Sequence, residues 1–201
     1  MKRIYFAGGS WAAAIYIGMC KGLEEKYGKE YYKQFSFSGD SVGAFIALLC
    51  SLGYSSEQSE KIYTNLADLA RKKGVWNGKM SEYHELMLND VINREDVYKK
   101  LENNKFSLGV SNYWHKHKTY KSWENNEHLK KTLRASFHVP FYCKYQGLLD
   151  NCFAYDGGFS MDNKVLSQYD ITIGRAKCYD LSYDNSLIHP KKIYYFLIFY
   201  I

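Results

Sequence analysis

Apolar residues along this chain occur in two different patterns. Short apolar runs at 4–7 and 35–37 each end at a glycine-containing turn. After the first run, the segment 11–27 has apolar residues at three- and four-residue steps, and after the second, 41–52 is an apolar stretch of helical length. Short apolar runs are typical of buried strands, and the three-to-four spacing is typical of helices. The pattern predicts strand, turn and helix, repeated twice.

The rest of the chain continues to alternate. Residues 54–104 are polar with a helical pattern, which predicts a helical cap, and 126–137 is predicted to be a helix that ends before Pro140. Further short strands are predicted at 110–114, 118–123, 153–155, 171–173 and 193–201. Strands that alternate with helices indicate an α/β fold with a largely parallel sheet covered on both faces. The 201 residues fit one domain, spanning 1–201.

Composition narrows the class of protein. Hydrophobic residues make up 46% of the chain and charged residues 24%, which is ordinary globular usage and argues against disorder. The 27 Lys and Arg residues exceed the 21 Asp and Glu residues, and a net charge of +6 favours polyanions such as nucleic acid or anionic lipid headgroups. The five cysteines are scattered and form no C-x-x-C pair, so reduced thiols in a cytosolic compartment are the simplest interpretation.

The chain start and the apolar runs bear on membrane targeting. Lys2 and Arg3 precede an apolar run as in a signal peptide, but glycines at 8 and 9 and a serine at 10 interrupt that run. The longest candidate for a spanning helix, 193–201, is about half the ~20 apolar residues that a membrane requires. We therefore expect a cytoplasmic protein without a cleaved signal peptide or a transmembrane helix.

One pentapeptide matches the pattern of a nucleophile on a sharp turn. Gly39-Asp40-Ser41-Val42-Gly43 has the form G-x-S-x-G and lies at a predicted junction between a strand and a helix. Glycines on both sides of Ser41 leave the space that such a turn needs. Without further support the pattern is weak, because a glycine-rich helix start capped by Ser41 has the same composition.

Two other loops are predicted to open at the same edge of the sheet. Gly8-Gly9-Ser10 joins a strand to a helix, where backbone N–H groups can bind negative charge, such as the oxyanion formed during acyl transfer. Asp156-Gly157-Gly158 follows an aromatic strand, and its glycines would let a carboxylate approach another backbone closely. The carboxyl ends of parallel strands share one edge, where open α/β folds build their sites.

In four stretches the sequence resembles the patatin-like phospholipases, including their adipose triglyceride lipase branch. Residues 7–23 resemble the family's oxyanion loop and helix, 38–44 its nucleophile elbow, 133–141 its arginine-alanine-serine to proline segment, and 156–158 its dyad aspartate motif. The resemblance implies a three-layer α/β/α fold with a helical cap and a lipid acyl hydrolase of the phospholipase A or triacylglycerol lipase type. It also implies a lipid ester substrate, contact with a membrane or lipid-droplet surface, and no cofactor or metal.

The resemblance also assigns roles to individual residues. Ser41 would be the nucleophile and Asp156 its general base, with the amides of Gly8, Gly9, Ser10 and Val42 forming the oxyanion hole. Gly39, Gly43, Gly157 and Gly158 would support these two motifs. The sequence departs from the family at three positions of this loop. Ser10 stands where the family has its third glycine, Ala12 where it usually has a basic residue, and Ala13 where it has its next glycine.

Two other functions remain open at this stage. A conventional hydrolase triad of Ser41, Asp156 and His189 has the required chain order, although Ser41 would come early for that fold. A lipid-binding pseudoenzyme on the same scaffold is the other alternative, and the altered oxyanion loop is its support.

Three further features have interpretations without catalysis. His115 and His117 could share a face as metal ligands, but a solvated polar face is the preferred interpretation, and His138 is expected to be a packed structural histidine. The aromatic and basic stretch 113–131 is interpreted as a solvated edge with core tryptophans. If it binds a partner, membrane fits better than nucleic acid, and we expect no nucleic-acid partner.

Overall fold

A single mixed sheet organises the molecule. The computed structural model describes residues 1–93, 96–102, 105–112, 114, 116–140, 142–144 and 148–174. In this part of the chain six strands form one sheet in the order β4-β3-β2-β1-β6, with β5 also paired to β3. The strands are β1 (Lys2–Phe6), β2 (Phe35–Asp40), β3 (Phe106–Asn112), β4 (His117–Tyr120), β5 (Ala154–Asp156) and β6 (Ile171–Ile173).

The centre of the sheet is parallel and one side is antiparallel. β1 pairs in parallel with β2 and with β6, and β2 pairs in parallel with β3. The strands β4 and β5 both run antiparallel to β3. The predicted α/β class with a mostly parallel sheet is therefore confirmed, and each predicted strand within the described residues is present. The predicted strand 193–201, His189 and Cys178 lie outside the described residues.

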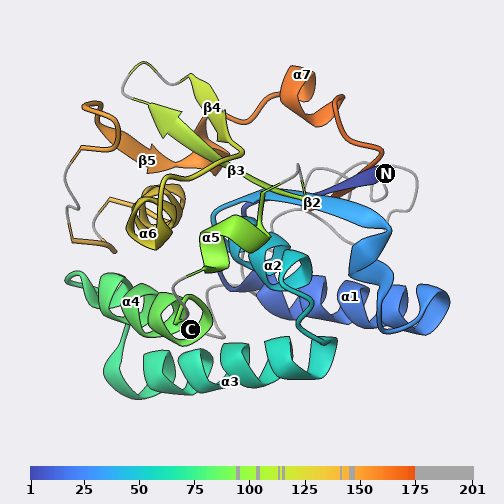
Figure 1. The fold of residues 1–201 in the computed structure, drawn as a ribbon. Helices are drawn as coiled ribbons and strands as arrows, with labels where there is room; N and C mark the ends of the chain where they lie inside the picture. The colour runs from blue at the N-terminus through green and yellow to red at the C-terminus, as the bar shows by residue number, and fades with distance from the viewer. Residues whose placement is uncertain are drawn as a thin grey trace, which may run out of the picture.

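Helices cover the sheet as Figure 1 shows. The inner helices α1 and α2 lie next to the sheet; of the outer helices, α3 packs against α1, and α4 packs against α3 and α6. The helices are α1 (Ala13–Tyr27), α2 (Val42–Ser51), α3 (Ser56–Lys73), α4 (Lys79–Val91), α5 (Val97–Lys100), α6 (Asn126–Ser136) and α7 (Asn163–Leu166), with short 3-10 turns at Ser10–Ala12, Tyr31–Lys33 and Gly157–Phe159. The described residues of the region 54–104 form the helices α3, α4 and α5, as the helical pattern predicted. In Figure 1, α7 lies on the opposite side of the sheet from α1–α4.

The core between the sheet and the inner helices is aromatic and aliphatic. Phe6, Phe37 and Phe106 come from three neighbouring strands and are fully buried, as is Leu48 from α2. The helix α2 is buried along nearly its whole length, which explains why its sequence is apolar on all sides. This packing fixes both ends of the turn that carries Ser41.

One prediction about side-chain exposure needs correction. In the stretch 113–131, Trp123 is buried as expected, whereas Trp114 is 74% exposed. Of the described cysteines, Cys20, Cys50 and Cys143 are buried and Cys152 is exposed. Among the residues that the structure describes, no helix has the length and apolar character needed to cross a membrane.

Candidate active site

The G-x-S-x-G segment forms a tight turn between β2 and α2. Ser41 has φ 54° and ψ −134°, a backbone conformation that residues with side chains rarely adopt. A Cβ atom added at Gly39 would lie 2.4 Å from the carbonyl carbon of Gly43, and one added at Gly43 would lie 2.1 Å from the carbonyl oxygen of Phe6. Both glycines are therefore required by close backbone packing around Ser41.

The buried hydroxyl of Ser136 holds this turn from the side of α6. The backbone N–H of Ser41 donates to Ser136 Oγ at 3.0 Å, and Ser136 Oγ donates to the carbonyl oxygen of Gly109 at 2.7 Å. Ser136 thus links the turn to β3. Sequence reasoning missed this role, although Ser136 lies in the segment 133–141 that carried one of the four resemblances.

The pairing of β3 explains how Asp156 reaches the same place. Asp40, the last residue of β2, pairs with Gly109, and Asp156, the last residue of β5, pairs with the next residue, Val110. The strand β4 occupies one edge of β3, and it pairs there with residues that also pair with β2 or β5. A strand has only two edges, so β2 and β5 both lie along the other edge of β3. Because β5 pairs with β3 from the residue after the last one that pairs with β2, the end of β5 places Asp156 next to the Ser41 turn.

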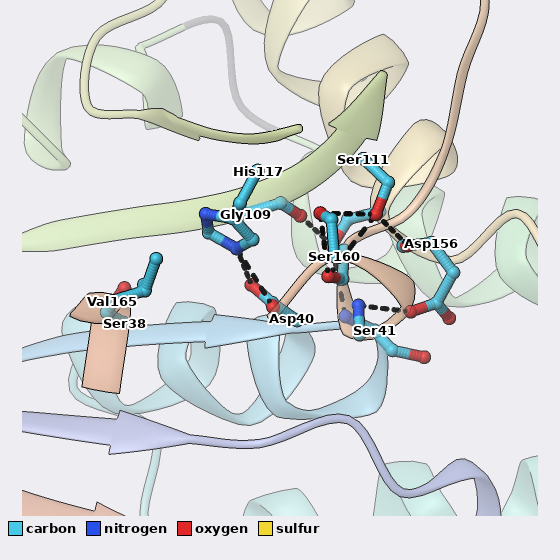
Figure 2. Close-up of polar contacts among 12 residues, drawn as sticks. Ser38, Asp40, Ser41, Gly109, Ser111, His117, Asp156, Ser160 and Val165 are labelled. Carbon is cyan, nitrogen blue, oxygen red and sulfur yellow. Dashed lines mark hydrogen bonds and ion pairs between the residues drawn. The ribbon is translucent and has the colours of Figure 1, made fainter. Parts of the chain in front are cut away.

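Hydrogen bonds fix the backbone and the carboxylate of Asp156. Its N–H donates to the carbonyl oxygen of His138 at 3.0 Å, and its carbonyl oxygen accepts from Ser111 Oγ at 2.7 Å. Its Oδ1 atom accepts from the N–H of Gly158 at 2.9 Å. Ser41 Cβ and Asp156 Oδ1 lie 3.3 and 3.9 Å from the same point, the place of a Cβ on Gly8. Figure 2 shows the Ser41 hydroxyl and the Asp156 carboxylate turned toward one another.

Burial changes the acidity of Asp156. Asp156 is only 5% exposed, and this burial raises the pKa of its carboxyl group from 3.8 to about 7. Hydrogen bonds from the side chain of Ser41 and from the Gly158 N–H lower the pKa, while the negative charge of Asp40 raises it further. A carboxylate with this pKa is a stronger base than an exposed one and still partly ionised at neutral pH.

The predicted oxyanion residues border a cavity beside Ser41 and Asp156. Within the described part of the chain, the N–H groups of Gly8 and Gly9 donate to no acceptor. Ser10 has φ 52°, a positive value that a glycine adopts more easily. Val42 is the first residue of α2, so its N–H belongs to the helical turn that has no acceptor within the helix.

A cavity of about 600 Å³ lies beside Ser41 and Asp156. Most of its wall is apolar and comes from the inner and outer helices and from the segment after α6; it includes Phe45, Leu66, Met80, Tyr83, Met87, Phe137 and Tyr142. The predicted helical region therefore supplies much of the wall. A volume of this size suits a small organic ligand or part of a lipid chain.

The histidines need one correction and one addition. His138 is buried as expected, and burial lowers its pKa. The prediction of a solvated His117 is wrong, because its side chain is buried against Asp40; His115 lies outside the described residues. His84 also lines the cavity, and burial lowers its pKa to about 4, so the imidazole is neutral near pH 7. Sequence reasoning did not single out His84.

A comparison with known protein families found a match. A family model, that of the patatin-like phospholipases, matches residues 4–167 of the chain. The matched range includes Ser41, Asp156, the Gly8 loop and most of the cavity wall. No curated protein matches the chain.

Proposed function

Since the chain belongs to the patatin-like phospholipase family, whose members hydrolyse lipid esters, we propose that it cleaves carboxylic ester bonds of lipids with a Ser41–Asp156 dyad. The observation that carries the proposal is the juxtaposition of a serine on a strained turn with a buried carboxylate of raised pKa, both bordering an apolar cavity. Strained backbone and perturbed acidity gather at functional sites more often than elsewhere.

In the proposed reaction Asp156 accepts the proton of Ser41 Oγ while that oxygen attacks the ester carbonyl carbon. The bond to the leaving alkoxide then breaks, and Asp156 returns the proton to the alkoxide. Asp156 then takes a proton from a water molecule as that water attacks the acyl-enzyme carbonyl carbon. The bond from the acyl group to Ser41 Oγ breaks, Asp156 passes the proton to Ser41 Oγ, and the fatty acid leaves. The pKa of about 7 for Asp156 supports both proton transfers at neutral pH.

The negative charge of the tetrahedral intermediate needs donors that are already in place. The N–H groups of Gly8 and Gly9, which have no acceptor among the described residues, are the proposed donors, with those of Ser10 and Val42 beside them. Each well-placed donor commonly contributes about 3 kcal/mol to the stabilisation of such an oxyanion. No metal ion or cofactor has a step in this scheme.

The direct test is lipid hydrolysis by three proteins. Wild type, Ser41→Ala and Asp156→Asn are incubated with a mixed lipid extract, and released fatty acids are identified by mass. We expect release of fatty acids by wild type alone, and the identity of the deacylated lipid that forms alongside them gives the substrate class. Undiminished release by the Ser41→Ala variant would show that another residue is the nucleophile.

We further propose that one rim of the cavity contacts an anionic lipid surface. Trp76, in the turn between α3 and α4, is 60% exposed and stacks on the cavity residue Tyr142, with ring centroids 4.6 Å apart. The cations at this turn are Arg71, Lys72, Lys73, Lys79 and Lys144. Arg71 pairs with Asp68, and Lys79 and Lys144 both pair with Glu82. The side chain of Lys144 packs against Gly78 of the turn itself. Tryptophan and basic residues favour the headgroup region of a bilayer.

Vesicle binding tests this rim. Co-sedimentation is measured with phosphatidylcholine vesicles, with and without phosphatidylserine, for wild type, Trp76→Ser and the control Trp114→Ser. Trp114 is exposed too, but it lies between β3 and β4 and not in the turn that carries Trp76. We expect binding to require phosphatidylserine and to weaken in the Trp76 variant alone. Equal binding by both variants would contradict the assignment of this rim.

A further inference from the structure

Behind the Ser41 turn lies a buried pair of side chains that the proposed mechanism does not use. His117 Nε2 on β4 lies 3.0 Å from Oδ2 and 3.3 Å from Oδ1 of Asp40. The two side chains are 5% and 0% exposed, respectively. Figure 2 shows the pair on the far side of Ser41 from the Asp156 carboxylate. Neither residue lines the cavity, so the pair does not touch a substrate there.

The pair fills the space between the two catalytic motifs. A Cβ atom added at Gly109 would lie 2.0 Å from Asp40 Oδ1 and 2.2 Å from His117 Nε2. A Cβ atom added at Gly157 would lie 2.8 Å from Asp40 Cγ. The carboxylate therefore packs against β3 and against the residue after Asp156. Because Asp40 itself precedes Ser41, its position affects both motifs at once.

A carboxylate in this place needs a partner. Burial of an unpaired carboxylate is strongly unfavourable, and a hydrogen-bonded cation or N–H donor offsets that cost. The other groups that face Asp40 are Tyr5 on β1, Tyr169 and Asp156. Burial raises the pKa of both tyrosines, and the charge of Asp40 adds to the rise. Of these four neighbours of Asp40, His117 approaches both carboxylate oxygens, with Nε2 at 3.3 Å from Oδ1 and 3.0 Å from Oδ2.

We propose that His117 is a positioning residue for the hydrolysis proposed above, on which this inference rests. By donating its Nε2 hydrogen to Asp40, it holds that carboxylate between β3 and Gly157 and thereby keeps Ser41 and Asp156 in register.

Steady-state kinetics on the full chain separate this role from a purely structural one. His117→Leu removes the donor, whereas His117→Gln replaces it with an uncharged N–H at a similar reach. His128→Leu is the control, because His128 approaches Asp150 at 3.6 Å in another His–Asp pair that does not line the cavity. Rates are expressed per site that reacts with a fluorophosphonate, so that unfolded protein does not count.

The expected result is a loss in kcat with KM nearly constant. For His117→Leu we expect kcat to fall by on the order of tenfold to a hundredfold, the usual effect of a small misplacement of reacting groups. His117→Gln should retain most of kcat, and His128→Leu should be unchanged. Adding Asp40→Asn to His117→Leu should restore part of the lost rate, because no unpaired carboxylate then remains.

Other outcomes overturn the inference. Unchanged kcat in His117→Leu does so, and so does an equal loss in the Leu and Gln variants without recovery in the double variant. If His117→Leu does not fold, His117→Asn takes its place, since the shorter amide does not reach Asp40. An active wild type with unaffected variants refutes only this role of His117, whereas an inactive wild type that no fluorophosphonate labels refutes the proposed hydrolysis itself.

Discussion

Replacement of Asp156 by asparagine should stabilise the protein at the same time as it abolishes hydrolysis. The carboxyl has a pKa of 3.8 in an exposed setting and about 7 in the folded protein, where it is buried. The folded state therefore holds the proton more tightly than the unfolded state. Stability from this proton is fully present below pH ~4 and is lost as the pH rises to 7, because the unfolded chain has already released the proton.

The size of the effect follows from the shift. About three pH units at 1.36 kcal/mol each give about 4 kcal/mol between the acidic and alkaline limits, as an upper value. An asparagine cannot ionise, yet its Oδ1 can still accept from the Gly158 N–H as the carboxylate does. At pH 8 we therefore expect Asp156→Asn to exceed wild type by about 2–4 kcal/mol, with the gap narrowing toward pH 4.

Urea unfolding of both proteins at a series of pH values measures this gap. Asp150→Asn is a control of opposite sign, because hydrogen bonds from Tyr120 and Lys118 lower the pKa of Asp150. Its φ of 50° is one that asparagine tolerates, so the change adds no backbone strain. This variant should be less stable than wild type at pH 8, and the difference should vanish in acid. An Asp156→Asn variant without extra stability at pH 8 would refute the reasoning.

Three further results are expected. The value of kcat/KM should fall about tenfold per pH unit below pH 7, because Asp156 becomes protonated; a kcat/KM that does not change between pH 7 and pH 5 would contradict the role of Asp156 as base. Ser136→Ala should cost about 1–3 kcal/mol in urea unfolding and lower kcat, whereas Thr132→Val, which removes a buried hydroxyl bonded within α6, should leave kcat unchanged; equal kcat values would refute the link. Leu66→Trp should narrow the cavity and reduce hydrolysis of long-chain relative to short-chain p-nitrophenyl esters, and an unchanged preference would place the acyl chain elsewhere.

The chain's local patterns were sufficient to predict the elements of the fold. Glycine turns after short apolar runs located β1 and β2, and the helix after each began within about two residues of its predicted start. The direction of β4 and β5 could not be predicted in this way, because a short strand has the same pattern in a parallel or an antiparallel pair. That direction matters, since antiparallel β5 is what carries Asp156 to the end of β2.

Side chains that act across elements were the harder part to predict. His117 lies between the charged residues Lys116 and Lys118 on a short strand, and this pattern suggested exposure. Only the pairing of β4 with β3 shows that the His117 side chain crosses Gly109 to reach Asp40. Ser136 ends a helix whose local pattern gives no sign of its bond to Ser41. Ser41 and Asp156 were easier to predict, because each lies next to glycines that the close approach of neighbouring atoms requires.

The central claim, that Ser41 is a nucleophile activated by Asp156, is tested most directly by covalent labelling. Each protein is treated with a fluorophosphonate and examined by intact mass and peptide mapping. We predict one phosphonyl group on wild type, located at Ser41, none on Ser41→Ala and much slower addition to Asp156→Asn. A wild-type protein that gains no label, or a label that maps to another residue, would contradict the account.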